Sequence, residues 1–274
     1  MSSRARLAPV LPSVSVVIPS RDDAEALRTC LDLLARQSVA PFEVVVVDNG
    51  SSDGTAELAR SLGAVVVDEP RVGIPSAAAA GYDAAQGDVI ARLDADSRPG
   101  RRWVERVARS MRDPRRDAVT GVGTFYDLPR PVGGVLAAVY LAAYYVLSHL
   151  ALGHTVLWGS SMAVRRRTWL GVRDDVHRDD PELHDDMDLA FVLGPTRRVR
   201  LAPRLRVRVS ARPLRGAAQM RRRFERAFRT LEVNWRVHPP WLRWRDRVER
   251  AQSEVSDRAG RSSRRSSAGG RGSP

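Results

Sequence analysis

The chain has 274 residues, of which 43% are hydrophobic, so it can form one large domain or two small ones. This composition excludes an intrinsically disordered protein, and the single cysteine, Cys30, excludes an intramolecular disulfide and a cysteine zinc cluster. The net charge of +13 comes from the C-terminal quarter, because residues 203–250 contain 15 arginines and only four acidic residues. No long apolar stretch follows the basic start of the chain, so we expect no secretory signal.

Residues 14–125 alternate short β-branched runs with stretches of helical periodicity. The pattern predicts strands over 14–18, 43–47, 64–68 and 88–94, and helices over about 23–37, 55–62 and 75–86. Strands that are apolar on both faces and separated by helices predict an α/β fold: an open, mainly parallel sheet with helices on both faces. Ligands bind such sheets beyond the carboxyl ends of the strands, where Asp48 and Asp94 lie.

Residues 132–152 form the longest uncharged stretch and are long enough to span a bilayer. A single span would place Asp94 and the later acidic residues on opposite sides of a membrane. We therefore expect a helix that is either buried in the protein or faces a membrane surface.

The last third of the chain contains a strand that enters a helix (158–169), an acidic cluster at a helix start (177–194) and a basic segment. Beyond residue 203 the pattern predicts a basic amphipathic helix that ends at Pro239–Pro240, with three tryptophans near its end. The tail over 251–274 is rich in Ser, Gly and Arg, which predicts disorder.

Three pairs of acidic residues lie at successive ends of predicted strands or helices: Asp48 with Asp53, Asp94 with Asp96, and Asp185 with Asp186. Hard oxygen ligands without cysteine suit Mg²⁺ or Mn²⁺, which usually also bind substrate phosphates. A divalent ion would remove the repulsion between Asp94 and Asp96. Aspartates in a first helical turn also cap a helix, which is the alternative explanation for the third pair.

Four motifs resemble the family 2 glycosyltransferases of the GT-A fold, and the resemblance covers residues 14 to about 235. VSVVIPSRDDAEALRTCLDLL resembles the opening strand and helix, with Asp22 and Asp23 in place of the usual Asn-Glu. EVVVVDNGSSDGT is similar to the D-D-G-S-x-D-G-T loop, with Asn49 replacing its second Asp. DADS matches D-x-D, and LHDDMDLAF is similar to E-D-x-x-L, with Asp185 in the Glu position.

The resemblance implies a role for each matching position. It places a nucleotide-sugar at Pro19, Ser20, Asp23, Asp48, Asp53, Arg92, Asp94 and Arg212, and a Mn²⁺ or Mg²⁺ ion at Asp96 and Asp94. Asp186, with Asp185 beside it, would be the catalytic pair, and Asp186 would take the proton from an acceptor hydroxyl. A single displacement of this kind inverts the anomeric configuration.

Two departures from the family pattern change these expectations. The usual A-R-N-x-G reads AAAAG at residues 77–81, so polar contacts from that helix are missing and the donor preference is expected to differ. The Q-x-x-R-W motif of processive members is only approximated at Gln219, which favours a single transfer over polymer synthesis.

Several residues allow two interpretations. Arg92 either contacts a phosphate or is a solvated residue at a strand end. Arg212 and Arg215 either bind a diphosphate from a mobile loop or have no such role. His184 is a metal ligand or a cap. Trp158 and Gly159 border an acceptor pocket, or the tryptophan packs in the core.

The expected domain organisation is an N-terminal extension (1–12), a nucleotide-sugar-binding half (13–125), an acceptor-side half (126–202), a basic C-terminal helical segment (203–250) and a disordered tail (251–274). The predicted function is a metal-dependent, inverting transfer of a sugar from a nucleoside diphosphate to a hydroxyl group of a glycan or a lipid-linked sugar. Peripheral membrane contact through 132–152 and 203–250 would place a cytoplasmic protein at the inner face of the membrane.

Two alternative functions stay open. A nucleotidyltransferase also needs a metal and a nucleotide site, but IPSRDDAEA lacks the glycine-rich loop that such enzymes usually carry. A non-enzymatic protein that binds nucleic acid or membrane through its basic segment is the other alternative. Because the charge is segregated from the predicted sheet, we expect no nucleic-acid partner.

Overall fold

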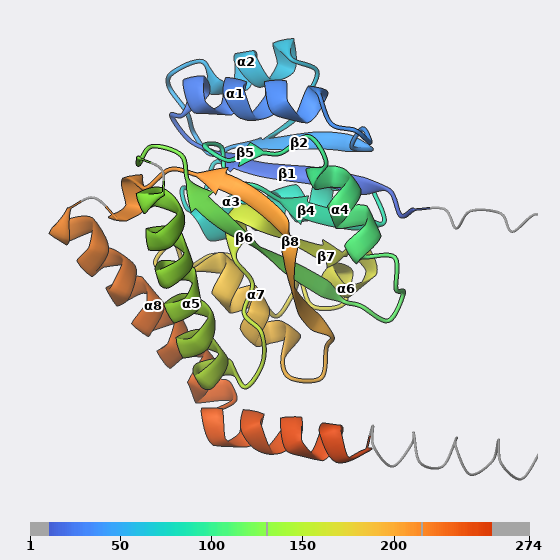
Figure 1. Ribbon diagram of the computed structural model, residues 1–274, viewed down its shortest axis with the longest axis vertical. Helices are drawn as coiled ribbons and strands as arrows, with labels where there is room; N and C mark the ends of the chain where they lie inside the picture. Colours follow the sequence, from blue (N-terminus) through green and yellow to red (C-terminus); the bar gives the residue numbers. More distant parts are fainter. Residues whose placement is uncertain (1–10, 130, 215, 254–274) are drawn as a thin grey trace, which may run out of the picture.

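One mixed sheet of eight strands organises the protein, in the order β3-β2-β1-β4-β7-β6-β8-β5. The computed structural model describes residues 11–129, 131–214 and 216–253. Helices lie on both sides of the sheet (Figure 1), which confirms the predicted α/β class. The strands are β1 (Val14–Ser20), β2 (Glu43–Asp48), β3 (Val65–Asp68), β4 (Val89–Arg92), β5 (Arg98–Pro99), β6 (Ala118–Phe125), β7 (Met162–Arg165) and β8 (Val199–Val209).

The first four strands run parallel, as the sequence predicts. They are joined by α1 (Ala24–Ala35), α2 (Thr55–Ser61) and α3 (Ile74–Ala84). The strands therefore end at one edge of the sheet, where Ser20 is the register partner of Asp48. Three of the four alanines of the AAAAG stretch are buried, and a Cβ on Gly81 would come within 2.4 Å of Val17. Small residues there allow α3 to approach the sheet closely.

The second half of the sheet changes direction at β7, which runs antiparallel to both β4 and β6. The short helix η1 (Gly159–Ser161) precedes β7 and lies at the edge where β4 ends. Because β7 starts at that edge, it must run back across the sheet. The sheet contains antiparallel pairs around β7 and at β5, but β6 and β8 pair in parallel as the first four strands do, so the sheet is mainly parallel as expected. The other helices before the C-terminal segment include α4 (Trp103–Ser110), α6 (Arg166–Leu170) and α7 (Asp185–Leu193), and the buried hydrophobic residues of α4 and α7 belong to two different core clusters.

The uncharged stretch forms one helix, α5 (Val132–Leu152), with the predicted bounds. Its inner face packs on β6, where the Tyr145 hydroxyl lies 2.9 Å from Thr120 Oγ1 and donates to Gly121 O. Its outer face stays exposed. In the described part of the chain α5 is the one helix long and apolar enough to cross a membrane, judged by length and composition.

The C-terminal segment lies against α5 (Figure 1). Helix α8 (Ala217–Val237) follows the short η2 (Arg212–Leu214), and a further helix covers 240–253. The expectation of a helical segment from residue 203 is wrong at its start, because residues 203–209 belong to β8, which pairs with β6. Arg243 of that last helix is buried and donates to the Leu152 and Phe191 carbonyls. This part of the basic segment therefore holds the fold together. The predicted extension and tail lie largely outside the described residues, over 1–10 and 254–274.

Candidate active site

Arg92 and Asp94 follow each other closely at the end of β4. The Arg92 side chain is 5% exposed, so it is paired and not solvated. Its Nη2 donates to Asp94 Oδ1 over 3.1 Å, and Ser160 Oγ donates to Asp94 Oδ2 over 2.5 Å. Both oxygens of Asp94 are therefore held by side chains from β4 and η1.

Arg92 also joins β4 to the first turn of α7. Its Nη1 donates to Asp185 Oδ2, so one guanidinium bridges Asp94 and Asp185. Burial raises the pKa of the Asp185 carboxyl to about 7, and the facing Arg92 opposes this rise. The structure thus brings together two acidic motifs that are distant in sequence.

Asp186 lies beside η1 with a fixed orientation. The Gly159 N–H donates to Asp186 Oδ2 over 2.7 Å, and the Met187 N–H donates to Oδ1 over 2.8 Å. A Cβ on Gly159 would come within 2.6 Å of the Arg92 guanidinium, so glycine is needed for this approach. Trp158 is 8% exposed and its ring packs against Gly123, which places it in the core.

Arg212 links a second pair of carboxylates, Asp23 and Asp96. Its Nη2 donates to Asp23 Oδ2 over 2.9 Å and to Asp96 Oδ2 over 3.2 Å. Burial and the neighbouring charge of Asp94 raise the pKa of Asp96 to about 6, against the effect of Arg212. Arg212 therefore lies beside Asp23 and Asp96, and its predicted contact with a diphosphate stays a prediction, while Arg215 lies outside the described residues.

The chemistry of Asp94 and Asp96 fits a hard divalent cation. Their charges are close enough for Asp94 to raise the pKa of Asp96, and a dication would offset this repulsion. Within the described ranges, no group of three or more His, Cys, Asp and Glu side chains is arranged to hold a metal. One or two carboxylates together with substrate phosphates are, however, a common Mg²⁺ site. The residues fit a metal shared with a phosphate-bearing substrate.

Polar atoms without partners lie where β1 and β2 end. Ser20 Oγ and Asp48 Oδ1 are buried and have no hydrogen-bond partner among the described residues. Buried polar groups are usually paired, so these two atoms are suited to contact a ligand. Pro19 precedes this pair on β1. Asp53 is different, because its Oδ2 accepts the Ala24 N–H over 3.0 Å and ties the loop to α1.

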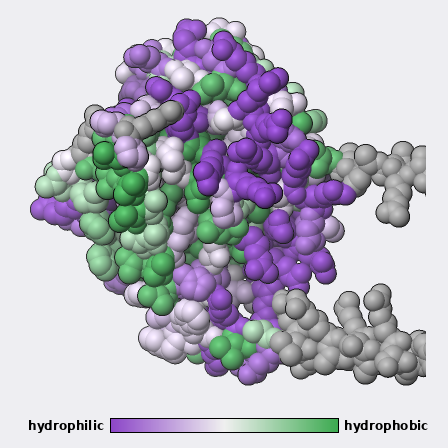
Figure 2. Space-filling model, in the orientation of Figure 1, coloured by the Kyte–Doolittle hydropathy of each residue, from purple (hydrophilic) through white to green (hydrophobic). Residues whose placement is uncertain are grey.

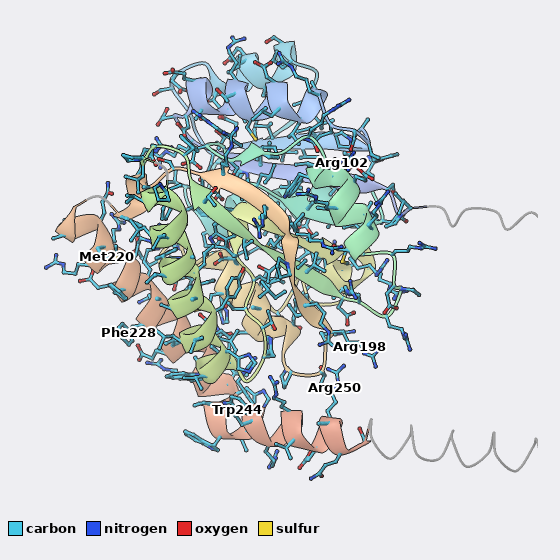
Figure 3. The ribbon with its side chains drawn as sticks, in the orientation of Figure 1. Arg102, Arg198, Met220, Phe228, Trp244 and Arg250 are labelled. Carbon is cyan, nitrogen blue, oxygen red and sulfur yellow. The ribbon has the colours of Figure 1, made fainter. Side chains whose placement is uncertain are left out.

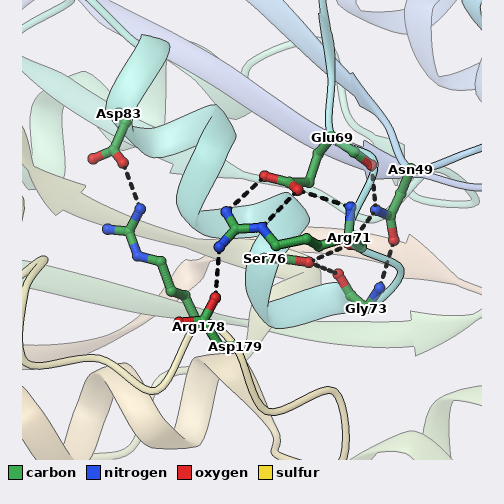
Figure 4. Close-up of polar contacts among 8 residues, drawn as sticks. All are labelled: Asn49, Glu69, Arg71, Gly73, Ser76, Asp83, Arg178 and Asp179. Atoms are coloured by element: carbon green, nitrogen blue, oxygen red, sulfur yellow. Dashed lines mark hydrogen bonds and ion pairs between the residues drawn. The ribbon is translucent and has the colours of Figure 1, made fainter.

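Asn49, the departure from the family's second Asp, has a structural role (Figure 4). Its Nδ2 donates to the Glu69 and Arg71 carbonyls, each over 2.8 Å, and its Oδ1 accepts the Gly73 N–H over 2.8 Å. Only an amide can donate and accept in this way. Asn49 therefore fixes the segment between β3 and α3.

We expect Asn49→Asp to lower the free energy of unfolding by about 2–3 kcal/mol, because a buried carboxylate would face two carbonyl oxygens. Urea unfolding monitored by circular dichroism measures the change. The matched control is Asp68→Asn, the reverse isosteric swap at an exposed position of β3, which should change stability by less than about 1 kcal/mol. Equal stability of the two variants would contradict the role assigned to Asn49.

The sequence pattern predicts a basic helix where α8 lies, but it did not identify Ser160 or the cavity that one face of α8 lines. Gln219, Arg222, Arg223 and Arg226 recur at helical spacing and line one cavity. That spacing was the signal in the sequence that could have identified them. His184 contacts the same helix: its N–H donates to Thr230 Oγ1 over 2.9 Å, and its Nε2 lies 3.1 Å from the Arg223 carbonyl oxygen. Its ring therefore packs on α8.

Comparisons with known proteins identify the family and the fold of the chain. The model of the family described as "Glycosyl transferase family 2" matches residues 15–166, more than half of the chain. Glycosyltransferase AglE of Haloferax volcanii is 34% identical over 138 residues, which are 47% of this chain and 44% of that protein. The chain spans about half the length of the curated relatives that it matches.

Two solved structures share the fold. The mannosyltransferase PcManGT from Pyrobaculum calidifontis, in complex with GDP-Man and Mn²⁺, has a TM-score of 0.59 and 24% identity over 80% of this chain and 63% of that one. Glucosyl-3-phosphoglycerate synthase from Mycobacterium tuberculosis, in complex with Mn²⁺, UDP and phosphoglyceric acid, has a TM-score of 0.58 and 20% identity over 81% and 78% of the two chains.

Proposed function

The chain belongs to glycosyl transferase family 2, and we propose that it transfers a sugar from a nucleoside diphosphate to an acceptor hydroxyl in one inverting step. The observation that carries this proposal is the juxtaposition of Asp94, Asp185 and Asp186. Asp94 follows β4 and the other two begin α7, and the two segments meet around Arg92 and η1 at the carboxyl edge of the sheet. A nucleotide-sugar bound at this edge would have its diphosphate near Asp94 and its sugar near Asp186.

The ends of β1 and β2 would hold the nucleoside. The partnerless Ser20 Oγ and Asp48 Oδ1 supply polar contacts for a base or a ribose, and Asp23 lies across Arg212 from Asp96. Asp96 and Asp94 would hold the metal, which when bound offsets charge on the departing diphosphate. Arg212 would add a guanidinium to the same phosphates.

Asp186 would act as the general base. As the acceptor oxygen forms its bond to the anomeric carbon, the hydroxyl proton passes to Asp186 and the bond to the diphosphate breaks. The two backbone N–H donors orient the carboxylate for this transfer. Because attack and departure occur on opposite sides of the carbon, the configuration inverts. The Arg92 bridge positions the carboxylates relative to one another.

The ligands of the two similar structures support a nucleotide donor and a divalent ion, since one contains GDP-Man with Mn²⁺ and the other UDP with Mn²⁺. The test is a panel of UDP-, GDP- and TDP-sugars, measured for thermal stabilisation and for release of the nucleoside diphosphate. We expect one class of nucleotide to stabilise the protein only when Mn²⁺ or Mg²⁺ is present. No response to any donor, with either metal, would overturn the proposal.

We also propose peripheral contact with an anionic membrane through the outer face of α5. Val135, Val139, Val146, Leu147 and Leu150 of this face are exposed, and Figure 2 shows hydrophobic residues gathered over the helix. Phe228 of α8 adds to the face and projects outward (Figure 3). The arginines of α8 lie next to it, and an apolar face flanked by arginine suits an anionic bilayer surface.

We expect Val139→Glu combined with Leu147→Glu to lower binding to phosphatidylglycerol vesicles by about tenfold or more, because two exposed apolar side chains are replaced by anions. Vesicle flotation measures the bound fraction. Phe42→Glu, the same type of change at an exposed apolar residue before β2, is the matched control and should leave binding unchanged. Equal flotation of all three proteins would exclude α5 from membrane contact.

A further inference from the structure

An arginine-lined cavity of about 400 Å³ lies between η2 and α8. Its lining consists of Arg212, Gln219, Arg222, Arg223 and Arg226, which we name the arginine pocket. The last four side chains share one face of α8 because of their helical spacing. No acidic side chain is among these lining residues, so the pocket presents a concentrated positive charge.

Two of the arginines of the pocket form no ion pair within the described part of the chain. Arg212 pairs with Asp23 and Asp96, and Arg222 pairs with Glu182 over 3.0 Å. Arg223 instead donates to the Tyr140 hydroxyl over 3.0 Å, and Arg226 donates to the carbonyls of residues 181 and 183.

Neither Arg223 nor Arg226 forms an ion pair among the described residues, and the buried Arg226 Nε has no hydrogen-bond partner there. Arg226 affects the buried Asp185 carboxyl electrostatically without forming an ion pair with it. A partly buried guanidinium without a directly paired carboxylate is unfavourable, and a bound anion would reduce this cost. Phosphate suits the site well, because guanidinium groups bind it through paired N–H donors.

The pocket lies next to the segment that leads into the proposed base. Arg226 donates to the Leu183 carbonyl over 3.0 Å, and the His184 ring contacts the Arg223 carbonyl. At the opposite end Arg212 contacts Asp96. The α8 arginines thus approach the reacting centre from the side of Asp186, whereas the proposed donor diphosphate lies on the side of Asp96.

We propose that the arginine pocket binds a phosphate group of the acceptor and so places the acceptor hydroxyl beside Asp186. This inference rests on the proposed function and adds the substrate class, a phosphate-bearing acceptor. The phosphate belongs either to a soluble phosphate ester or to a lipid headgroup held at the exposed face of α5. A phosphate anchored by Arg223 and Arg226 leaves the donor site free, so both substrates can bind together.

The test measures binding of inorganic phosphate by calorimetry, without donor or metal, to the full chain and to two variants. We expect Arg223→Gln to weaken binding about tenfold or more, and Arg221→Gln to leave it unchanged. Arg221 is on the same helix outside the pocket, is 79% exposed and pairs with Glu225. Arg222→Gln serves as a second pocket variant, and unfolding curves confirm that each variant is folded. Equal phosphate affinity of pocket and control variants would overturn the proposal.

Two further arms separate the possible phosphate sources and sites. Binding to phosphatidylcholine vesicles is compared with and without phosphatidic acid, which supplies a lipid phosphate. A lipid source is supported if phosphatidic acid increases binding and if Arg223→Gln, but not Arg221→Gln, loses this increase. Inorganic phosphate should still bind when the nucleoside diphosphate and Mn²⁺ are at saturation, and competition would overturn the acceptor assignment. If phosphate binds in the pocket while no nucleotide-sugar binds at all, the proposed function fails and the anion site stands.

Discussion

Asp186→Asn is expected to lower kcat by about 10²- to 10⁴-fold while leaving binding of the donor unchanged. An amide cannot accept the hydroxyl proton, and this range is typical for the loss of a positioned general base. Asparagine keeps the side-chain volume and one acceptor oxygen, so one of the Gly159 and Met187 N–H donors loses its acceptor, at a cost of about 1 kcal/mol that should leave the fold intact. Steady-state release of the nucleoside diphosphate gives kcat, and calorimetry gives donor affinity.

Asp32→Asn, the same change on the exposed face of α1, is the matched control and should keep full turnover. Asp185→Asn distinguishes the role of Asp185 from that of Asp186, because only Asp185 forms an ion pair with the buried Arg92. We expect it to lower the free energy of unfolding by about 3 kcal/mol, whereas Asp186→Asn should alter stability much less. A kcat for Asp186→Asn within a few fold of the parent protein would exclude Asp186 as the base.

Asp96→Asn is expected to weaken metal-dependent binding of the nucleoside diphosphate by at least about 100-fold. Loss of a residue that only supports a metal ligand typically costs about 10- to 100-fold, so loss of a ligand should cost more. The asparagine side chain can still accept the Arg212 hydrogen bond, so the change removes mainly the carboxylate charge. Titration of Mn²⁺ at fixed nucleotide concentration measures the effect.

Chelation with EDTA should reduce the affinity of the parent protein to that of Asp96→Asn and leave the variant unaffected. Asp22→Asn is the control, because Asp22 is an exposed aspartate of the neighbouring loop whose Oδ1 accepts the Ser52 N–H. Nucleotide binding that survives both EDTA and Asp96→Asn would show that the site around Asp94 and Asp96 binds the nucleotide without a metal.

The parallel half of the fold was predictable because its signals are local. β-branched runs bounded by turn residues specify strands, and the rule for parallel sheets then places Asp48 and Asp94 at one edge. The reversal at β7 was not predictable in this way, since strand direction depends on where the chain re-enters the sheet.

Which side chains of the uncharged and basic segments are buried could be determined only from the tertiary structure. Composition predicts a helix over 132–152 but does not show whether its neighbours cover it, and the structure leaves its outer face exposed. Composition also does not show what surrounds each arginine of the basic segment. Arg243 is buried and donates to backbone carbonyls, whereas Arg223 and Arg226 line a cavity.

The sequence by itself determined the first four parallel strands, the helices between them and the aspartates at strand and helix ends, because periodicity and turn chemistry act over a few residues. It did not determine β6 or β8, and residues 203–209, expected in a helical segment, belong to β8. Only the tertiary structure decided that Arg92 bridges Asp94 and Asp185, and that Arg212 links Asp23 and Asp96. These pairings join residues far apart in the chain. They depend on how whole elements pack, and no local pattern encodes that packing.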